Sequence, residues 1–170
     1  MKAESAVSTA AYIVAGVLIA YSINLGMSFM LSTTMPVVAV ESNSMVPAFY
    51  RGDILILGGK NASLLKVGDV IVYSPEGQSV PIVHRIISIN QDGSFQTKGD
   101  ANAGQLSFEK HISPSEIHGV VIFIIPYVGW IKIAVTSYVI PNIFWIIIAL
   151  LTAFAAFKAS KYIKSTYKIK

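Results

Sequence analysis

Three short polar stretches carry residue types that could do chemistry: Ser42–Pro47 (SNSMVP), Val83–Ile86 (VHRI) and Thr97–Asn102 (TKGDAN). In chain order they supply a serine, a histidine and an aspartate. A serine hydroxyl is a poor nucleophile until an adjacent base takes its proton, and an acid commonly holds that base in the right tautomer. Ser44, His84 and Asp100 are therefore candidates for a nucleophilic triad.

Each candidate also has a purely structural interpretation. Ser44 could be a turn serine ahead of Pro47. His84 could be a hydrogen-bonded core histidine on an apolar strand, and Asp100 a turn residue after a glycine. Any chain of this length offers serine, histidine and aspartate in some combination, so spacing alone leaves both interpretations open.

The composition excludes several other kinds of chemistry. Cysteine is absent, so the chain has no disulfide, no thiol nucleophile and no cysteine zinc site. His111 and His118 have no acid or metal ligand at a suitable spacing, so we expect both at the surface. The sequence contains no metal-binding cluster of His, Asp and Glu and no glycine-rich phosphate loop. We therefore expect neither a metal nor a cofactor.

The sequence around these residues predicts short strands. The predicted strands are rich in β-branched and aromatic residues and are bounded by Gly, Pro, Asn and Asp. The predicted strands are 53–57, 69–73, 80–89, 94–98 and 118–125. The stretch Asn90–Gly93 predicts a hairpin turn, because Asp-Gly readily takes positive φ angles. No long amphipathic helix separates the strands. The fold class is therefore mainly β, with a small all-β domain.

This β-domain is flanked by two apolar runs, and the chain is 54% hydrophobic but only 13% charged. A soluble domain carries about 25% charged residues, so we exclude a disordered, nucleic-acid-wrapping or fully soluble protein. Residues 10–31 and 138–157 each have about the 20 residues that cross a bilayer. The first run is longer than a cleavable signal peptide, so we expect a retained anchor. Residues 119–135 contain Pro126, Gly129 and Lys132 and predict a strand followed by an interfacial segment.

The distribution of charge predicts the topology. Residues 32–137 contain seven basic and eight acidic residues, whereas residues 158–170 contain five lysines and no acid. Basic flanks stay in the cytoplasm. We therefore expect a short cytoplasmic N-terminus over residues 1–9, an extracytoplasmic catalytic domain over 32–137 and a basic cytoplasmic tail over 158–170.

The ordered motifs resemble those of a known family, signal peptidase I of the archaeal and endoplasmic-reticulum type, in which the base is a histidine. The motifs are SNSMVP, RGDILIL, VGDVIVY, VHRI, TKGDAN and IPYVGW, and they cover residues 41–130. In the commoner bacterial type a lysine is the base, so His84 places the chain in the Ser–His branch. The resemblance implies a membrane-bound serine endopeptidase that cleaves N-terminal signal peptides of exported preproteins after small residues at −1 and −3.

The resemblance also implies roles for single residues. Ser44 matches the nucleophile and His84 matches the general base. The Ser44 backbone N–H and the Ser42 side chain would donate to the oxyanion, and Met45 would border the pocket for the residue before the cut. The implied partners are signal peptides and the lipid bilayer, with the export translocon as a further candidate and no nucleic acid. The implied location is the cell membrane or an endoplasmic-reticulum-type membrane.

The acid of the triad has three candidate arrangements. Asp100 matches the aspartate of the family's GD-x-N box, and we expect it to orient His84. Many members of this branch carry a further aspartate downstream, where this chain has Leu106. Glu109 could reach His84 instead, or Asp100 could pair with Arg85 and leave a Ser–His dyad.

Two other classes of protein remain as alternatives. A catalytically inactive, membrane-anchored β-domain could act as a binding or assembly subunit, and the missing downstream aspartate is its only support. A transporter or channel subunit is disfavoured, because neither apolar run carries an ionisable residue.

Overall fold

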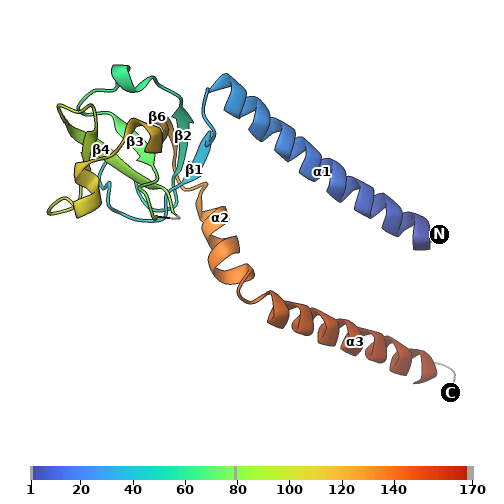
Figure 1. The fold of residues 1–170 in the computed structure, drawn as a ribbon. Coiled ribbons are helices and arrows are strands. Elements are labelled where there is room, and N and C mark those ends of the chain that lie inside the picture. The colour runs from blue at the N-terminus through green and yellow to red at the C-terminus, as the bar shows by residue number, and fades with distance from the viewer. Residues whose placement is uncertain (1, 79, 168–170) are drawn as a thin grey trace. The chain divides into compact units, whose positions relative to one another are not determined.

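The computed structural model describes residues 2–78 and 80–167, and it divides into two compact units, Met1–Gly129 and Trp130–Lys170. The first unit contains a six-stranded sheet with the strand order β1-β2-β6-β3-β4-β5 (Figure 1). All neighbouring strands are antiparallel. The strands are β1 (Val37–Ala39), β2 (Ile54–Gly58), β3 (Val70–Tyr73), β4 (Ile82–Ile89), β5 (Phe95–Lys98) and β6 (Ile117–Ile125). The prediction of a mainly β fold is confirmed.

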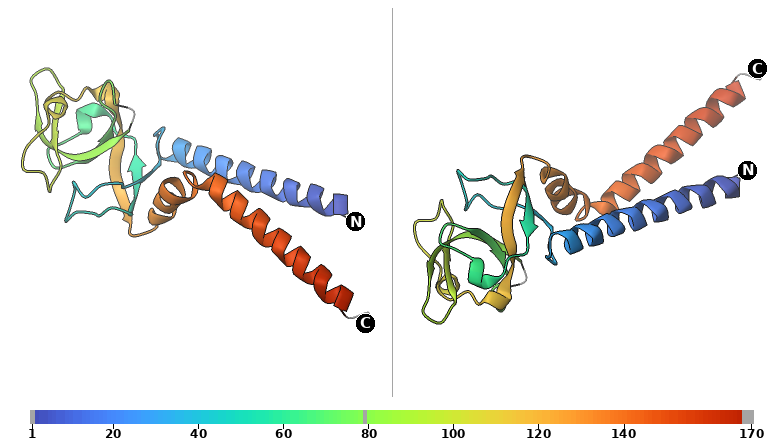
Figure 2. Two further views of the ribbon diagram at one scale, coloured as in Figure 1. Left: turned by 90° about the horizontal axis from the view of Figure 1, so that it is seen from below. Right: turned by 90° about the horizontal axis from the view of Figure 1, so that it is seen from above.

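Five of the six strands coincide with the predicted ones, and β1 was not predicted. Its three residues, VVA, are too few to show an alternating pattern, and pairing with β2 makes them a strand. Figure 2 shows β2 and β6 side by side from two further directions. The predicted hairpin joins β4 to β5, with Gly93 at a φ of 82° and the Asn90 N–H donating to the Ser94 carbonyl at 2.8 Å.

The core consists of two clusters of buried apolar side chains. One cluster packs the loop after β1 against β2 and β3 and contains Val40, Met45, Phe49, Leu55, Leu57 and Val72. The other packs β3, β4 and β5 together and contains Leu65, Ile71, Tyr73, Ile86, Phe95, Ile112 and Val120. The first cluster therefore supports the segment that carries Ser44, and the second supports the strand that carries His84.

A buried carboxylate shapes the loop between β1 and β2. Asp53 is 4% exposed and accepts hydrogen bonds from the backbone N–H groups of Tyr50, at 2.8 Å, and Tyr127, at 3.0 Å. Its own carbonyl accepts from the Val40 N–H at 2.9 Å. Asp53 thereby closes the loop that contains Ser44 and ties it to the turn after β6.

Two helices are long and apolar enough to cross a membrane. In the first unit, α1 (Lys2–Met30) contains an apolar span over Val7–Met30; in the second, α3 (Ile143–Tyr167) contains one over Ile143–Ser160. The side chains of both spans are exposed, as expected for surfaces that contact lipid. A π-helical turn (Val135–Val139) and Pro141 precede α3, so the long helix begins at Ile143. The predicted span over residues 138–157 stays a prediction.

Short helices complete the fold. The 3₁₀ turns are η1 (Ala62–Leu64), η2 (Ser107–Lys110) and η3 (Pro114–Glu116), and the second unit begins with α2 (Trp130–Ala134). Residues 119–135 thus form most of β6 and then helix, in agreement with the predicted strand. The turn η2 carries Glu109.

Candidate active site

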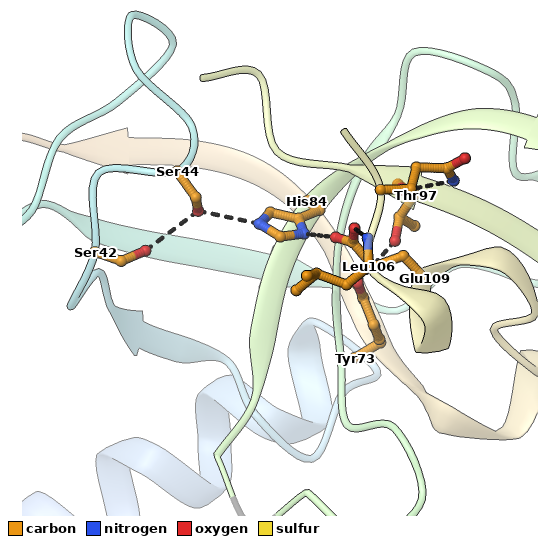
Figure 3. Close-up of polar contacts among 8 residues, drawn as sticks. Ser42, Ser44, Tyr73, His84, Thr97, Leu106 and Glu109 are labelled. Carbon is orange, nitrogen blue, oxygen red and sulfur yellow. Dashed lines mark hydrogen bonds and ion pairs between the residues drawn. The ribbon is translucent and has the colours of Figure 1, made fainter. Parts of the chain in front are cut away.

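The structure brings Ser44 and His84 together. Ser44 lies in the loop between β1 and β2, whereas His84 lies on β4, and the Ser44 Oγ is 3.0 Å from the His84 Nε2 (Figure 3). His84 is buried and Ser44 is half-buried. A hydroxyl at this distance can donate its proton to a neutral imidazole.

The opposite nitrogen of the ring contacts a carboxylate. His84 Nδ1 hydrogen-bonds to the Oε1 of Glu109, which is fully buried on η2. The other oxygen of the carboxylate, Oε2, accepts the backbone N–H of Leu106 at 2.6 Å. A carboxylate accepts a hydrogen bond from an Nδ1–H, so this contact favours the tautomer in which Nε2 keeps its lone pair toward Ser44. This is the tautomer that a general base needs.

Burial keeps the base neutral. The pKa of His84 is lowered from its usual 6.5 chiefly because burial disfavours the charged imidazolium, while Glu109 and, less strongly, Asp100 oppose that shift. At neutral pH the imidazole is therefore ready to accept a proton. The imidazolium that forms during a reaction would be stabilised by the neighbouring Glu109 carboxylate.

Asp100 lies elsewhere, contrary to our expectation that it orients His84. Its carboxylate pairs with Arg85, which donates from Nε to Oδ1 at 2.9 Å and from Nη2 to Oδ2 at 2.6 Å. His84 and Arg85 are adjacent on β4, so their side chains point to opposite faces of the strand. Asp100 follows β5 on the Arg85 face, and η2 brings Glu109 to the His84 face.

The two residues expected beside the nucleophile differ in their surroundings. The Ser42 Oγ lies 3.2 Å from the Ser44 Oγ, so its hydroxyl lies beside the candidate nucleophile (Figure 3). Met45 is 1% exposed and packs in the core with Phe49 and Leu55. The turn after Ser44 directs the Met45 side chain inward, and a role at the border of the pocket for the residue before the cut stays a prediction.

Sequence reasoning missed the backbone contacts that surround the pair. The Ala101 N–H donates to the Ser44 carbonyl at 2.8 Å. A β-carbon on Gly99 would lie 2.7 Å from that carbonyl oxygen and 2.8 Å from the His84 Nε2, so only glycine fits. The GD dipeptide suggested a turn, but nothing in the spacing showed that its glycine would touch the reactive groups.

A second buried layer lies beyond Glu109. Tyr73 and Thr97 are both fully buried, and their hydroxyl oxygens are 2.7 Å apart (Figure 3). The Gln105 amide donates to the Thr97 carbonyl at 2.9 Å. Burial raises the pKa of Tyr73, so it stays a neutral hydrogen-bonding phenol. Glu109 is likewise 0% exposed.

The remaining histidines do not join this site. His111 is exposed, as expected, and lies 3.4 Å from the Asn90 amide nitrogen. His118 is half-buried rather than exposed, because its Nε2 pairs with the Ser74 Oγ at 2.8 Å. Within residues 2–78 and 80–167, no group of three or more His, Asp or Glu side chains could hold a metal ion.

A serine, a neutral histidine and a buried carboxylate in one line, within a small β-domain, define a site of the serine-hydrolase class. Comparisons with known proteins give the family. The chain is 35% identical over 122 residues to the signal peptidase complex catalytic subunit SEC11 of Chaetomium globosum, covering 66% of this chain and 71% of that protein. It is 40% identical over 123 residues to SEC11 of Lachancea thermotolerans, covering 66% and 73%. The chain belongs to the family of signal peptidase complex catalytic subunits.

The similarity extends beyond fungi. The chain is 35% identical over 126 residues to the human signal peptidase complex catalytic subunit SEC11C, covering 66% of this chain and 64% of that protein. No family model matches the chain. The relatives therefore carry the family assignment, and the geometry of the site agrees with it.

Proposed function

We propose that this protein is a membrane-bound serine endopeptidase that removes N-terminal signal peptides from exported preproteins. The proposal rests on the consecutive hydrogen bonds that connect the Ser44 Oγ to His84 and His84 to Glu109, in a chain that belongs to this family. The relatives are named catalytic subunits, which argues against the alternative of an inactive β-domain.

The first half of the reaction is acylation. His84 Nε2 takes the proton of Ser44 as the Oγ attacks the scissile carbonyl carbon. The Ser44 N–H and the Ser42 hydroxyl donate to the resulting oxyanion, and such a donor is typically worth about 2.7–4 kcal/mol in the transition state. Glu109 stabilises the imidazolium. His84 then gives the proton to the leaving amine, which is the new N-terminus of the mature protein.

The second half is deacylation. His84, neutral again, removes a proton from a water molecule that attacks the acyl-enzyme carbonyl. The C–O bond to Ser44 breaks, and the Ser44 oxygen recovers its proton from His84. The signal peptide leaves with a free carboxylate. Every proton moves between Ser44, His84, water and the substrate, so the chain's own residues complete the cycle.

The substrate would bind as an extended peptide. β5 pairs with β4 only from Arg85 onward, whereas β3 pairs with β4 from Ile82. At Ile82 and Val83, directly before His84, the edge of β4 that faces away from β3 therefore has no partner strand among the described residues. Backbone groups on a free edge bind extended chains by strand addition. Small residues at −1 and −3 of the substrate are supported by the family resemblance.

The membrane arrangement follows from the two apolar spans and the charges that flank them. Both termini lie in the cytoplasm and residues 32–137 lie outside, since the five lysines of residues 158–170 favour the cytoplasmic side. A signal peptide is itself an apolar segment, so this arrangement presents the cut site to Ser44. The relatives are named as subunits of a complex, so further subunits and the export translocon are proposed partners.

Cleavage of a preprotein by the purified full-length protein in lipid tests the proposal. Wild type should release the mature protein, whereas Ser44→Ala and His84→Ala should lower the cleavage rate by at least ~10³-fold. Ser42→Ala should lower kcat by ~10²-fold if its hydroxyl donates to the oxyanion. Cleavage that survives Ser44→Ala would contradict the mechanism, and a folded wild type that cleaves no preprotein would favour the inactive binding domain.

A further inference from the structure

The backbone of residues 99–101 lies directly against the nucleophile. The Ala101 N–H donates to the Ser44 carbonyl at 2.8 Å, and this bond joins the loop that carries the nucleophile to the chain that follows β5. Gly99 packs so closely that a β-carbon would lie within 2.7 Å of the same carbonyl oxygen. The position of residues 99–101 therefore sets the position of the Ser44 backbone.

An ion pair fixes this segment on its outer side. The Arg85 guanidinium donates two parallel hydrogen bonds to the Asp100 carboxylate, at 2.9 and 2.6 Å. Its third nitrogen, Nη1, donates to the Gly68 carbonyl at 2.9 Å. A planar fork held at three points has little freedom, so it specifies where the carboxylate and its backbone lie.

We infer that Arg85 and Asp100 are positioning residues for the nucleophile, acting through the Ala101 N–H on the Ser44 carbonyl. This inference rests on the proposed function for its activity readout. His84 and Arg85 are neighbours on β4, so the strand that carries the base also carries the anchor for the nucleophile. The position of Ser44 relative to His84 is therefore fixed by two consecutive residues of one strand. A misplacement of about 1 Å can cost ~10²-fold in rate.

The inference separates Asp100 from an acid that orients the base. A positioning role predicts that Asp100→Asn lowers kcat by ~10–100-fold with KM changed less than about twofold. It also predicts that the acid limb of the pH profile moves less than it does in Glu109→Gln, because Glu109 contacts His84 and Asp100 does not.

A double-mutant cycle tests the pairing. Arg85→Gln should lower kcat as Asp100→Asn does, and the double variant should be no slower than either single variant. The Lys60–Asp69 pair is the matched control, because its side-chain exposures are 32% and 24%, against 34% and 21% for Arg85 and Asp100. Lys60→Gln removes the same control pair from its other end and leaves the hydrogen bond from the Lys66 N–H to the Asp69 carboxylate in place, so this variant should retain kcat within about twofold. Losses that multiply in the double variant would overturn the inference.

Amide hydrogen exchange of the peptide that contains Ala101 provides a readout independent of cleavage. Exchange at this peptide should be faster in Asp100→Asn and Arg85→Gln than in wild type and in the control Lys60→Gln. Unchanged exchange, or an Asp100→Asn enzyme with kcat within twofold of wild type, would overturn the inference. Cleavage that persists in Ser44→Ala would instead contradict the proposed function and leave the exchange result standing.

Discussion

Two neighbouring residues of β4, His84 and Arg85, each bind a carboxylate from a later part of the chain, on opposite faces of the strand. On the inner face, the side chains of His84 and Glu109 are 6% and 0% exposed. On the outer face, the side chains of Arg85 and Asp100 are 34% and 21% exposed. Each pair joins a basic side chain to a carboxylate. The inner pair is buried, whereas the outer pair is partly exposed to solvent.

The difference in burial between the two faces explains how one strand can hold two pairs with different roles. In a buried site charges interact strongly, because little water screens them. Glu109 can therefore control the protonation of His84. On the outer face water weakens the ion pair, so the Arg85–Asp100 pair contributes geometry more than electrostatics. The inner pair governs the proton, and the outer pair places the nucleophile.

The largest effect should come from removing the charge on the inner face. Glu109→Gln keeps the size of the side chain but lets the amide donate to His84 Nδ1, which favours the wrong tautomer. We expect kcat to fall by ~10³–10⁴-fold. Preprotein cleavage measured beside circular dichroism checks this prediction, and a loss below about tenfold would show that Ser44 and His84 work as a dyad.

The next effect concerns the backbone between the two faces. Gly99→Ala would place a methyl group against the Ser44 carbonyl and the His84 ring, so either the loop or the strand must shift. We expect a loss of ~10²-fold in kcat. Gly104→Ala is the matched control, because no atom lies within 4 Å of its β-carbon position. Equal activity of the two variants would contradict the close packing described for Gly99.

A smaller effect should follow from moving the acid from η2 to Leu106, the residue that precedes this turn. The Leu106 N–H contacts the Glu109 carboxylate, and the Leu106 side chain is 51% exposed. An aspartate at position 106 would bring its carboxylate close to that of Glu109. Adding Leu106→Asp to Glu109→Gln should restore ~10-fold of the lost rate, since a charge-assisted hydrogen bond is worth about 1.5–3 kcal/mol. A double variant no faster than Glu109→Gln would show that the carboxylate must come from position 109.

The smallest effect is a shift along the pH axis. Cleavage requires neutral His84, so kcat/KM rises with pH as the imidazolium loses its proton. Burial lowers the pKa of His84, and the midpoint of the acid limb should therefore lie below 6.5. Loss of the Glu109 charge removes a group that raises the pKa, so Glu109→Gln should move the limb to lower pH still. A limb that moves upward would mean that the titrating group is not His84.

Much of the architecture could be predicted from local sequence patterns. Alternation and turn residues placed five of the six strands, and runs of apolar residues placed both candidate spans, because these features depend on neighbours in the chain. The short strand β1 escaped prediction, since its three residues become a strand only by pairing with β2. The π-helical turn and Pro141 before the second long helix also escaped prediction, because they interrupt an apolar run without a change in hydropathy.

The site divides in the same way. The sequence by itself made Ser44 and His84 the candidates for nucleophile and base, because the ordered motifs that contain them resemble those of a known family. Only the tertiary structure decided which carboxylate contacts His84. The path of the chain after each strand or turn determines the face of β4 on which a carboxylate lies. Asp100 leaves β5 on the Arg85 face, and η2 folds Glu109 onto the His84 face. Distance along the chain is 16 residues for Asp100 and 25 for Glu109, yet the more distant carboxylate makes the contact, since packing rather than separation sets proximity.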